Sequence, residues 1–229
     1  MSLPLPFRDQ FECRGEILEV YASDRRGLVE YKFNHLGYRN NIDYSINETN
    51  AGIYLGSSIT SGIGINWDQT FVKLSSDLLA VKPYNFSQGC TKIDNNEILQ
   101  QVISLTKINF SPKFWVLQFI DLDRQFNAVT GDCDSGKNTS ENINKFVNIF
   151  STIEFLLHDK SWCFFGCDNL SHAIPDRIKN HNNCIAWNPK FIDLAGVGSH
   201  PGPKWHRMIS QGLQKSMISQ GLQKSIKTD

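Results

Sequence analysis

The fold of this 229-residue chain is constrained most by two kinds of apolar segment that alternate along it. Short, mainly apolar runs, typical of strands buried in a parallel sheet, occur at 51–56, 84–86, 114–120, 162–166 and 184–187. Longer segments with apolar residues at helical spacing occur at 67–80, 95–107 and 140–157. Strands that alternate with helices of this length predict a three-layer α/β/α sandwich around a mostly parallel, flavodoxin-like sheet.

Such a sheet binds its ligands beyond the carboxyl ends of the strands. Candidate functional residues are therefore those that directly follow the apolar runs. The polar, glycine-containing segment FNAVTGDCDSGKNTSEN (126–142) is predicted to be a surface excursion near this rim.

The charge balance indicates no polyanionic partner. Lys and Arg together number 23, as do Asp and Glu, so no net field attracts nucleic acid or an anionic membrane. The N-terminal stretch has too short an apolar run for a signal peptide, and no segment has the roughly 20 apolar residues of a membrane span. We expect a cytoplasmic protein that binds neither nucleic acid nor membrane; the sequence does not indicate its oligomeric state.

The cysteines are dispersed and are expected to be free thiols. Cys163 and Cys167, with His181 and Cys184, could be imagined around a zinc ion. However, a C-x3-C pair within a strand does not direct both side chains at one ion. We therefore expect no metal site.

The two ends of the chain are predicted to lie outside the main domain. Two β-rich runs at 15–22 and 28–34 suggest a hairpin or two edge strands, within an N-terminal extension of residues 1–45. The main domain is expected at 46–212. The remaining residues, 213–229, are predicted to be a helical tail.

A nine-residue sequence, MISQGLQKS, occurs twice in succession near the C-terminus, at 208–216 and 217–225. Nine residues make two and a half helical turns, so equivalent residues of the two copies face opposite sides of a helix. We expect the second copy to be solvated or frayed; a partner-binding helix is the alternative.

The turn YLGSSITSGIG (54–64) places serines among glycines directly after a buried strand. A hydroxyl there is exposed at the rim of the sheet, and the N–H groups of the following helix can face a developing oxyanion. Ser58 is thus a candidate nucleophile. Alternatively, Ser57, Ser58 and Thr60 cap the helix, or the glycines cradle a phosphate.

The segment SHPGPKWH (199–206) is the second candidate for chemistry. Pro201 and Pro203 restrict the backbone beside His200, which helps to fix an imidazole that accepts a proton from a serine. A structural histidine in a turn is the alternative. His206 lies inside the expected last helix and is predicted to pack or cap.

With these two turns, the chain resembles the SGNH or GDSL-like hydrolases. Their first block has the form G-D-S-I-T followed by a pair of glycines, and the chain matches it with GSSITSGIG (56–64), where Ser57 replaces the aspartate. The resemblance implies that Ser58 is the nucleophile. A segment that precedes this block in some relatives is similar to FNHLGYRN (33–40), with an implied structural role.

Two further blocks follow in the family's order. The second combines a strand, an Asn and a Gly, and the chain matches it with YNFSQGC (84–90), which implies that the Gly89 N–H is an oxyanion donor. The last block is D-x-x-H, often continued as H-P-G-P-K, and the chain matches it with VGSHPGPK (197–204). This match implies that His200 is the base.

The chain departs from the family's pattern at two points. Val197 stands where the family has its aspartate, and the nearest carboxylate, Asp193, could serve only if the loop folds back. No Asn follows the 114–120 strand, so the side-chain oxyanion donor is absent or comes from elsewhere. Asp121, Asp123 and Arg124 occupy that part of the rim, where they form an ion pair or bind a polar substrate group; two aspartates alone are weak support for a cation.

The leading hypothesis is a cofactor-free serine hydrolase that cleaves a small-molecule or sugar-linked acyl ester, with Ser58 as nucleophile and His200 as base. One rival is an inactive module with this fold that binds carbohydrate or protein, which Val197 and the missing Asn favour. A second rival is a flavodoxin-like phosphate or nucleotide binder, which leaves the histidine turn without a role.

Overall fold

A computed structural model describes residues 17–21, 28–34, 36–40, 42–87, 93–108, 110–122, 124–126, 133–135, 139–167, 173–195 and 200–222. Its centre is a five-stranded parallel sheet with the strand order β4-β3-β5-β8-β9. The strands are β3 (Ala51–Leu55), β4 (Lys82–Asn85), β5 (Phe114–Phe119), β8 (Trp162–Gly166) and β9 (Cys184–Trp187). Numbered within the sheet alone, this order is 2-1-3-4-5, the flavodoxin-like order.

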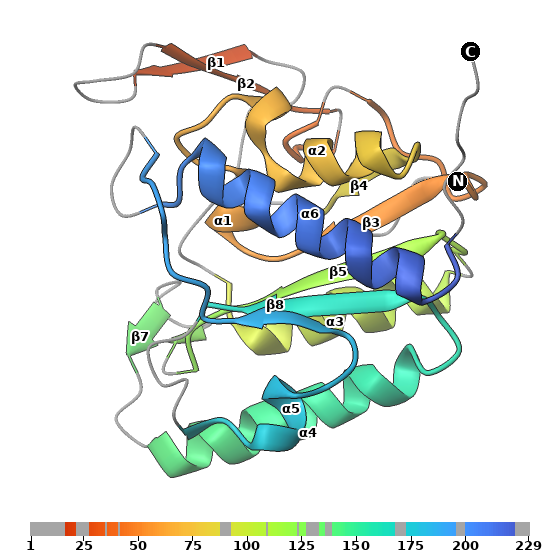
Figure 1. The fold of residues 1–229 in the computed structure, drawn as a ribbon, viewed down its shortest axis with the longest axis vertical. Helices are drawn as coiled ribbons and strands as arrows, with labels where there is room; N and C mark the ends of the chain where they lie inside the picture. The colour runs from red at the N-terminus through yellow and green to blue at the C-terminus, as the bar shows by residue number, and fades with distance from the viewer. Residues whose placement is uncertain are drawn as a thin grey trace.

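Helices cover both faces of the sheet (Figure 1). One face carries α1 (Ser58–Ser61), α2 (Phe71–Leu78), the short 3-10 helix η1 (Trp67–Gln69) and α6 (Pro203–Ser219). The other face carries α3 (Asn95–Lys107), α4 (Thr139–Leu156) and α5 (Asp176–Lys179). The predicted three-layer α/β/α sandwich with a parallel, flavodoxin-like sheet is therefore confirmed.

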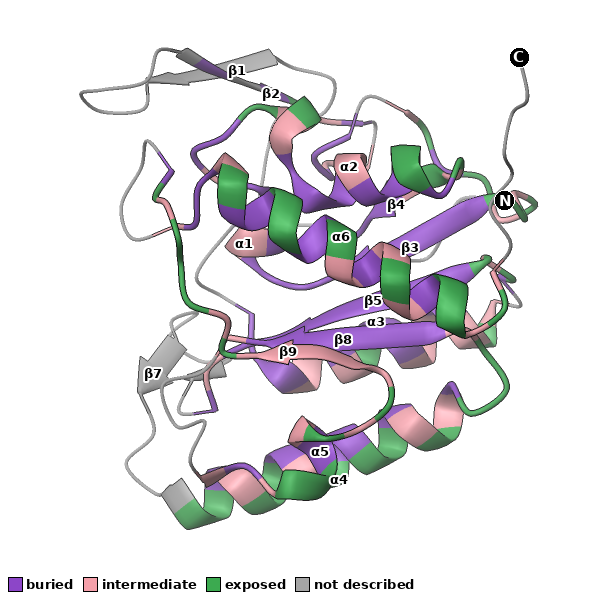
Figure 2. Ribbon diagram, in the orientation of Figure 1, coloured by how far each residue is buried: buried purple, intermediate pink, exposed green. Residues whose placement is uncertain are grey.

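Two hydrophobic cores lie on the two faces, because successive side chains of a strand point to opposite sides. Val116 and Phe165 pack with residues of α2 and α6. Their neighbours Leu117 and Phe164 pack with residues of α3 and α4. The central strands are buried throughout (Figure 2), which explains their mainly apolar sequences.

Two short antiparallel pairs accompany the sheet. The strands β1 (Ile17–Tyr21) and β2 (Leu28–Lys32) pair with each other, as the two N-terminal runs predicted, and Tyr31 of β2 is buried. The strand β6 (Arg124–Phe126) leads into the expected surface excursion and pairs with β7 (Cys133–Ser135) within it; this pair was not predicted.

No helix in the described part of the chain has both the length and the apolar character of a membrane span.

The helix α6 contains the first MISQGLQKS copy and the beginning of the second, and it continues across the predicted boundary at 212/213. Equivalent residues do lie on opposite faces: Ile209 and Met217 are buried, whereas Met208 and Ile218 are partly exposed. Each copy nevertheless packs against the core, because it has an adjacent Met and Ile and one of the two faces inward: Ile209 in the first copy and Met217 in the second.

The second copy therefore is not a solvated tail where the structure describes it. Besides the fully buried Met217, Leu222 packs against the same core. The Gln220 amide accepts from the Trp162 N–H at 3.2 Å and donates to the Trp162 carbonyl at 3.0 Å. The second copy docks because Ile209, Leu213 and Met217 are spaced four residues apart, which keeps one face of α6 apolar across both copies.

We predict that Met217→Ala lowers the free energy of unfolding by about 2–4 kcal/mol, because it empties a closed site in the core. Ile218→Ala, the matched change on the exposed face, should cost less than about 1 kcal/mol. Urea denaturation of both variants, followed by circular dichroism, measures the difference. Equal effects would show that the second copy does not dock.

Candidate active site

Ser58 is the first residue of α1, three residues after the end of β3. Its side chain is half-buried at the carboxyl edge of the sheet. The helix has only four residues and ends at Gly62, whose φ of 72° is the left-handed conformation that glycine adopts most easily. The sequence GSSITSG thus forms a tight turn that presents a serine hydroxyl at its helical start.

His200 meets this serine from a segment 142 residues away: its Nε2 lies 2.9 Å from Ser58 Oγ. The backbone around His200 is held by an antiparallel bridge between Leu194 and Pro201. The Ala195 N–H donates to the His200 carbonyl at 2.8 Å. The structure therefore brings together the two residues that the sequence placed in the nucleophile and base positions.

Asp193 lies beside the histidine turn, but its carboxylate is directed at the start of α6. Its Oδ2 accepts from the Lys204 N–H and its Oδ1 from the Trp205 N–H, both at 2.9 Å. A Cβ at Gly202 would lie 2.5 Å from Oδ2, so only glycine allows this close approach. Asp193 therefore satisfies two of the N–H groups that a helix start leaves without partners.

The other predicted residues of the site are placed only in part. Gly89 and Asp123 lie outside the described residues, as does Val197. Asp121 is half-buried just after β5, and Arg124 begins β6. Their predicted roles in oxyanion stabilisation and substrate binding stay predictions.

Gln118 contacts the nucleophile turn and was not predicted from sequence. It lies near the carboxyl end of β5, and only 1% of its surface is exposed. Its Oε1 accepts from the N–H groups of Ser57 and Thr60, each at 3.1 Å. The available signal was a single amide in the otherwise apolar run FWVLQFI.

Arg39, in the segment FNHLGYRN, holds the other end of the same turn. Its Nη1 donates to the carbonyls of Ser61, at 2.9 Å, and Gly62, and its Nη2 donates to the Ile65 carbonyl at 2.7 Å. The guanidinium lies 4.2 Å from the centre of the Tyr31 ring, and burial lowers the pKa of Arg39 to about 10.

The end of β4 is joined to α1 by hydroxyl and amide groups. Ser87 Oγ lies 2.5 Å from Asn85 Oδ1 and 3.3 Å from Ser61 Oγ, and all three residues are buried. These contacts hold the end of β4 close to the nucleophile turn.

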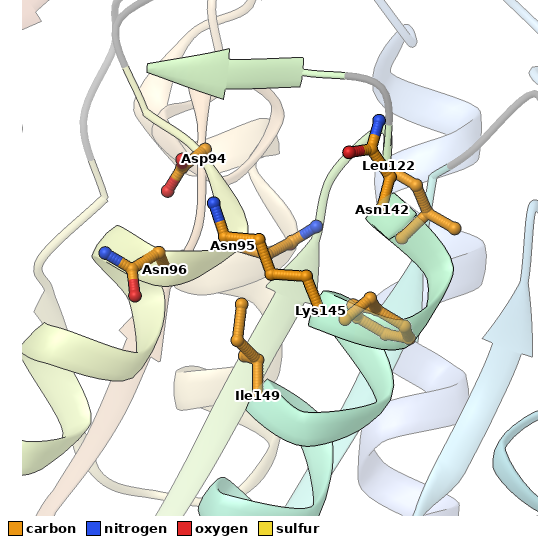
Figure 3. A pocket seen from close by; sticks show the side chains of 8 residues that line it. Asp94, Asn95, Asn96, Leu122, Asn142, Lys145 and Ile149 are labelled. Atoms are coloured by element: carbon orange, nitrogen blue, oxygen red, sulfur yellow. The ribbon is translucent and has the colours of Figure 1, made fainter. Parts of the chain in front are cut away.

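A small pocket lies at the same edge of the sheet, between the start of α3 and the first turns of α4 (Figure 3). Asn95, Asn142 and Lys145 are among its lining residues. Its volume of about 20 Å³ has room for about one water molecule, so it does not hold a substrate group. Asn95 instead pairs with the Ile120 backbone through two hydrogen bonds of 2.9 Å.

His206 has the packing and capping role that its position predicted. It is buried, stacks on Phe71, and its Nδ1 accepts from the Phe71 N–H at 3.1 Å at the start of α2. Burial, and then the charges of Arg39 and His200, lower the pKa of His206 to about 3. It is therefore a neutral acceptor that joins α6 to α2.

We predict that His206 makes the protein less stable as the pH falls below about 6.5, its ordinary pKa. The unfolded chain takes up a proton there and the folded protein does not, so acidification favours unfolding until about pH 3. Between pH 7 and pH 5 the loss should be about 1–2 kcal/mol.

The loss should disappear in His206→Gln and persist in His158→Gln, a change at an exposed histidine. Urea denaturation at both pH values measures it. An identical pH dependence in wild type and His206→Gln would contradict the assignment.

Comparisons with known proteins place the fold. No protein-family model matches the chain, and no curated protein matches its sequence. Among solved structures, it is similar to the acetyl xylan esterase Est2A from the rumen bacterium Butyrivibrio proteoclasticus. The TM-score is 0.52 and the identity 12%, and the match covers 80% of this chain and 67% of that chain. It is also similar to the psychrotrophic esterase EstA from Pseudoalteromonas sp., with a TM-score of 0.47, 13% identity, and coverage of 76% and 100%. Together with the strand order, the likeness to Est2A shows that the chain shares the three-layer α/β/α fold of this esterase.

Proposed function

We propose that the protein hydrolyses carboxylic esters through Ser58 and His200. The observation that carries the proposal is the 2.9 Å contact between Ser58 Oγ and His200 Nε2 at the carboxyl edge of the sheet. This is hydrogen-bond distance between a nucleophile and its base, at the edge where α/β proteins bind their ligands. The fold shared with Est2A agrees with this chemistry.

In the proposed reaction, His200 Nε2 takes the Ser58 proton while Oγ attacks the ester carbonyl. The resulting oxyanion is stabilised by the N–H groups of Ser58 and Gly89. His200 then returns the proton to the leaving alcohol, and an acyl-enzyme remains. A water molecule, deprotonated by His200, releases the acid and restores Ser58.

The Ser58 N–H suits the role of oxyanion donor because it belongs to the first turn of a helix, whose N–H groups have no partner within the helix. None of the backbone hydrogen bonds that the described residues make around α1 uses it: the donors there are the N–H groups of Ser61, Gly62 and Ile63.

We propose that catalysis rests on a Ser58–His200 dyad and that Asp193 contributes to folding. The support is that both Asp193 carboxylate oxygens accept backbone N–H groups of α6. Val197 offers no acceptor where the family has its aspartate. A dyad without this carboxylate should be slow, because removal of the acid from a complete triad costs about ten-thousand-fold in rate.

For the substrate, we propose a small or sugar-linked acyl ester, the class to which acetyl xylan belongs. No cofactor enters the proposed reaction. The competing function is an inactive binding module with the same fold. One observation supports it: the Asp193 carboxylate accepts backbone N–H groups of α6.

The first test is labelling with a fluorophosphonate serine probe. We expect the wild type to be labelled and Ser58→Ala to lose the label, whereas Ser151→Ala, at an exposed serine of α4, keeps it. Mass spectrometry of the labelled peptide identifies the serine. Absence of label on the wild type would favour the inactive module.

The second test separates the dyad from a relocated acid by assaying a short-chain aryl ester. Val197→Asp should raise kcat about tenfold or more, because it supplies the missing carboxylate. Asp193→Asn should leave kcat nearly unchanged while it lowers the free energy of unfolding by about 1 kcal/mol, through loss of one helix cap. If folded Asp193→Asn has no turnover, Asp193 is the catalytic acid and the dyad is wrong.

A further inference from the structure

Gln118 occupies the place where the direction of chain winding in the sheet reverses. Its strand β5 and the neighbouring β3 are connected in opposite directions across the sheet, to β8 and β4 respectively. In open α/β sheets, a crevice forms at this point beyond the carboxyl ends of the strands. Here the Gln118 side chain extends from β5 to the turn that follows β3, so it lies between the sheet and the candidate nucleophile.

The contacts of Gln118 bracket Ser58 in sequence. On one side, its Oε1 accepts from the Ser57 N–H at 3.1 Å, and its Nε2 donates to Ser57 Oγ at 3.0 Å. On the other side, Oε1 accepts from the Thr60 N–H at 3.1 Å and from the Thr60 hydroxyl at 2.6 Å. The residue before the nucleophile and the second residue after it are thus tied to one buried side chain.

The local sequence is adapted to this approach. A Cβ at Gly56 would lie 2.7 Å from Gln118 Oε1 and 2.3 Å from Thr60 Oγ1, so any larger residue would displace the amide. Ser57 and Thr60 are themselves almost completely buried. Without Gln118, two backbone N–H groups and two hydroxyls would lose their partner in the protein interior, which is costly.

We propose that Gln118 is a positioning residue: it holds the turn so that Ser58 Oγ stays within hydrogen-bond distance of His200. This inference rests on the proposed function. An amide suits the task because it accepts on one atom and donates on the other, and it remains neutral. A displacement of about 1 Å at a nucleophile can cost about a hundredfold in rate, so loss of the amide should affect turnover more than substrate binding.

The experiment compares Gln118→Met with Gln220→Met. Both changes replace a glutamine that bonds to backbone groups by an apolar side chain of similar length. Gln220 bonds to Trp162 at the amino end of β8, whereas Gln118 acts at the carboxyl edge. Thermal unfolding first establishes a temperature at which all variants are folded.

At that temperature we expect Gln118→Met to lower kcat for a short-chain aryl ester, and the rate of fluorophosphonate labelling, by tenfold or more. KM should change less than about threefold. Gln220→Met should retain both rates within about threefold. Equal rates in Gln118→Met and wild type, or equal losses in the two glutamine variants, would overturn the positioning role while leaving Ser58 as nucleophile.

Gln118→Glu gives a readout that a structural role alone would not change. Its carboxylate still accepts the N–H groups of Ser57 and Thr60, so it should be labelled faster than Gln118→Met, but more slowly than the wild type because its charge opposes the developing oxyanion. The added negative charge favours the protonated imidazole of His200, so the acid limb of the pH–rate profile should move to higher pH. An unmoved limb, or labelling no faster than Gln118→Met, would count against the proposal.

If the proposed function is wrong, the wild type itself is not labelled. This result is distinct from failure of the positioning role, in which the wild type is labelled. In that case, amide hydrogen exchange at Ser57 and Thr60 still reports on the clamp, by which we mean the hydrogen bonds from these two residues to Gln118. Retained protection of both amides in Gln118→Met would show that no clamp exists. Lost protection without any labelling would show a clamp that serves only the fold, and the positioning role would be wrong.

Discussion

The position of Ser58 depends on hydrogen bonds that side chains from elsewhere in the chain make to both ends of α1. A helix of four residues is too short to be stable alone, since nearly all its N–H and carbonyl groups lack partners within the helix. The Gln118 oxygen accepts N–H groups at its start, and the Arg39 guanidinium donates to carbonyls at its end. The short helix is therefore held by β5 on one side and by the segment before β3 on the other.

His200 is connected to the same helical layer of the sandwich as Ser58. Asp193 fixes the start of α6 just after the histidine turn, and His206, one turn into α6, accepts the first N–H of α2. Since α1, α2 and α6 lie on one face of the sheet, the packing of α6 on α2 keeps the start of α6, which directly follows the histidine turn, in the layer that contains Ser58. The segments of Ser58 and His200, 142 residues apart, are thus linked by one buried hydrogen bond between α2 and α6 and by the Asp193 cap on α6.

The sequence predicted the layers and the pair Ser58–His200 because both follow from local patterns. Mainly apolar runs mark buried strands, and serine and histidine turns at strand ends meet at one edge of a parallel sheet. Gln118 and Arg39 could not be placed in the same way, since their roles depend on partners in other elements. The nine-residue period alone does not predict the docking of the second MISQGLQKS copy, because either of its adjacent Met and Ile residues can face the core.

Two helix starts near the site use different acceptors, and the difference has a chemical consequence. Asp193 places a carboxylate at the start of α6, where a negative charge interacts favourably with the helix dipole. A carboxylate would stabilise the start of α1 in the same way, but negative charge would also develop there on the substrate oxygen during ester cleavage. A fixed negative charge beside that oxygen would oppose the transition state, whereas the neutral amide of Gln118 accepts the same N–H groups without this penalty. The choice of glutamine at the nucleophile helix and aspartate at the following one is therefore consistent with an oxyanion at Ser58.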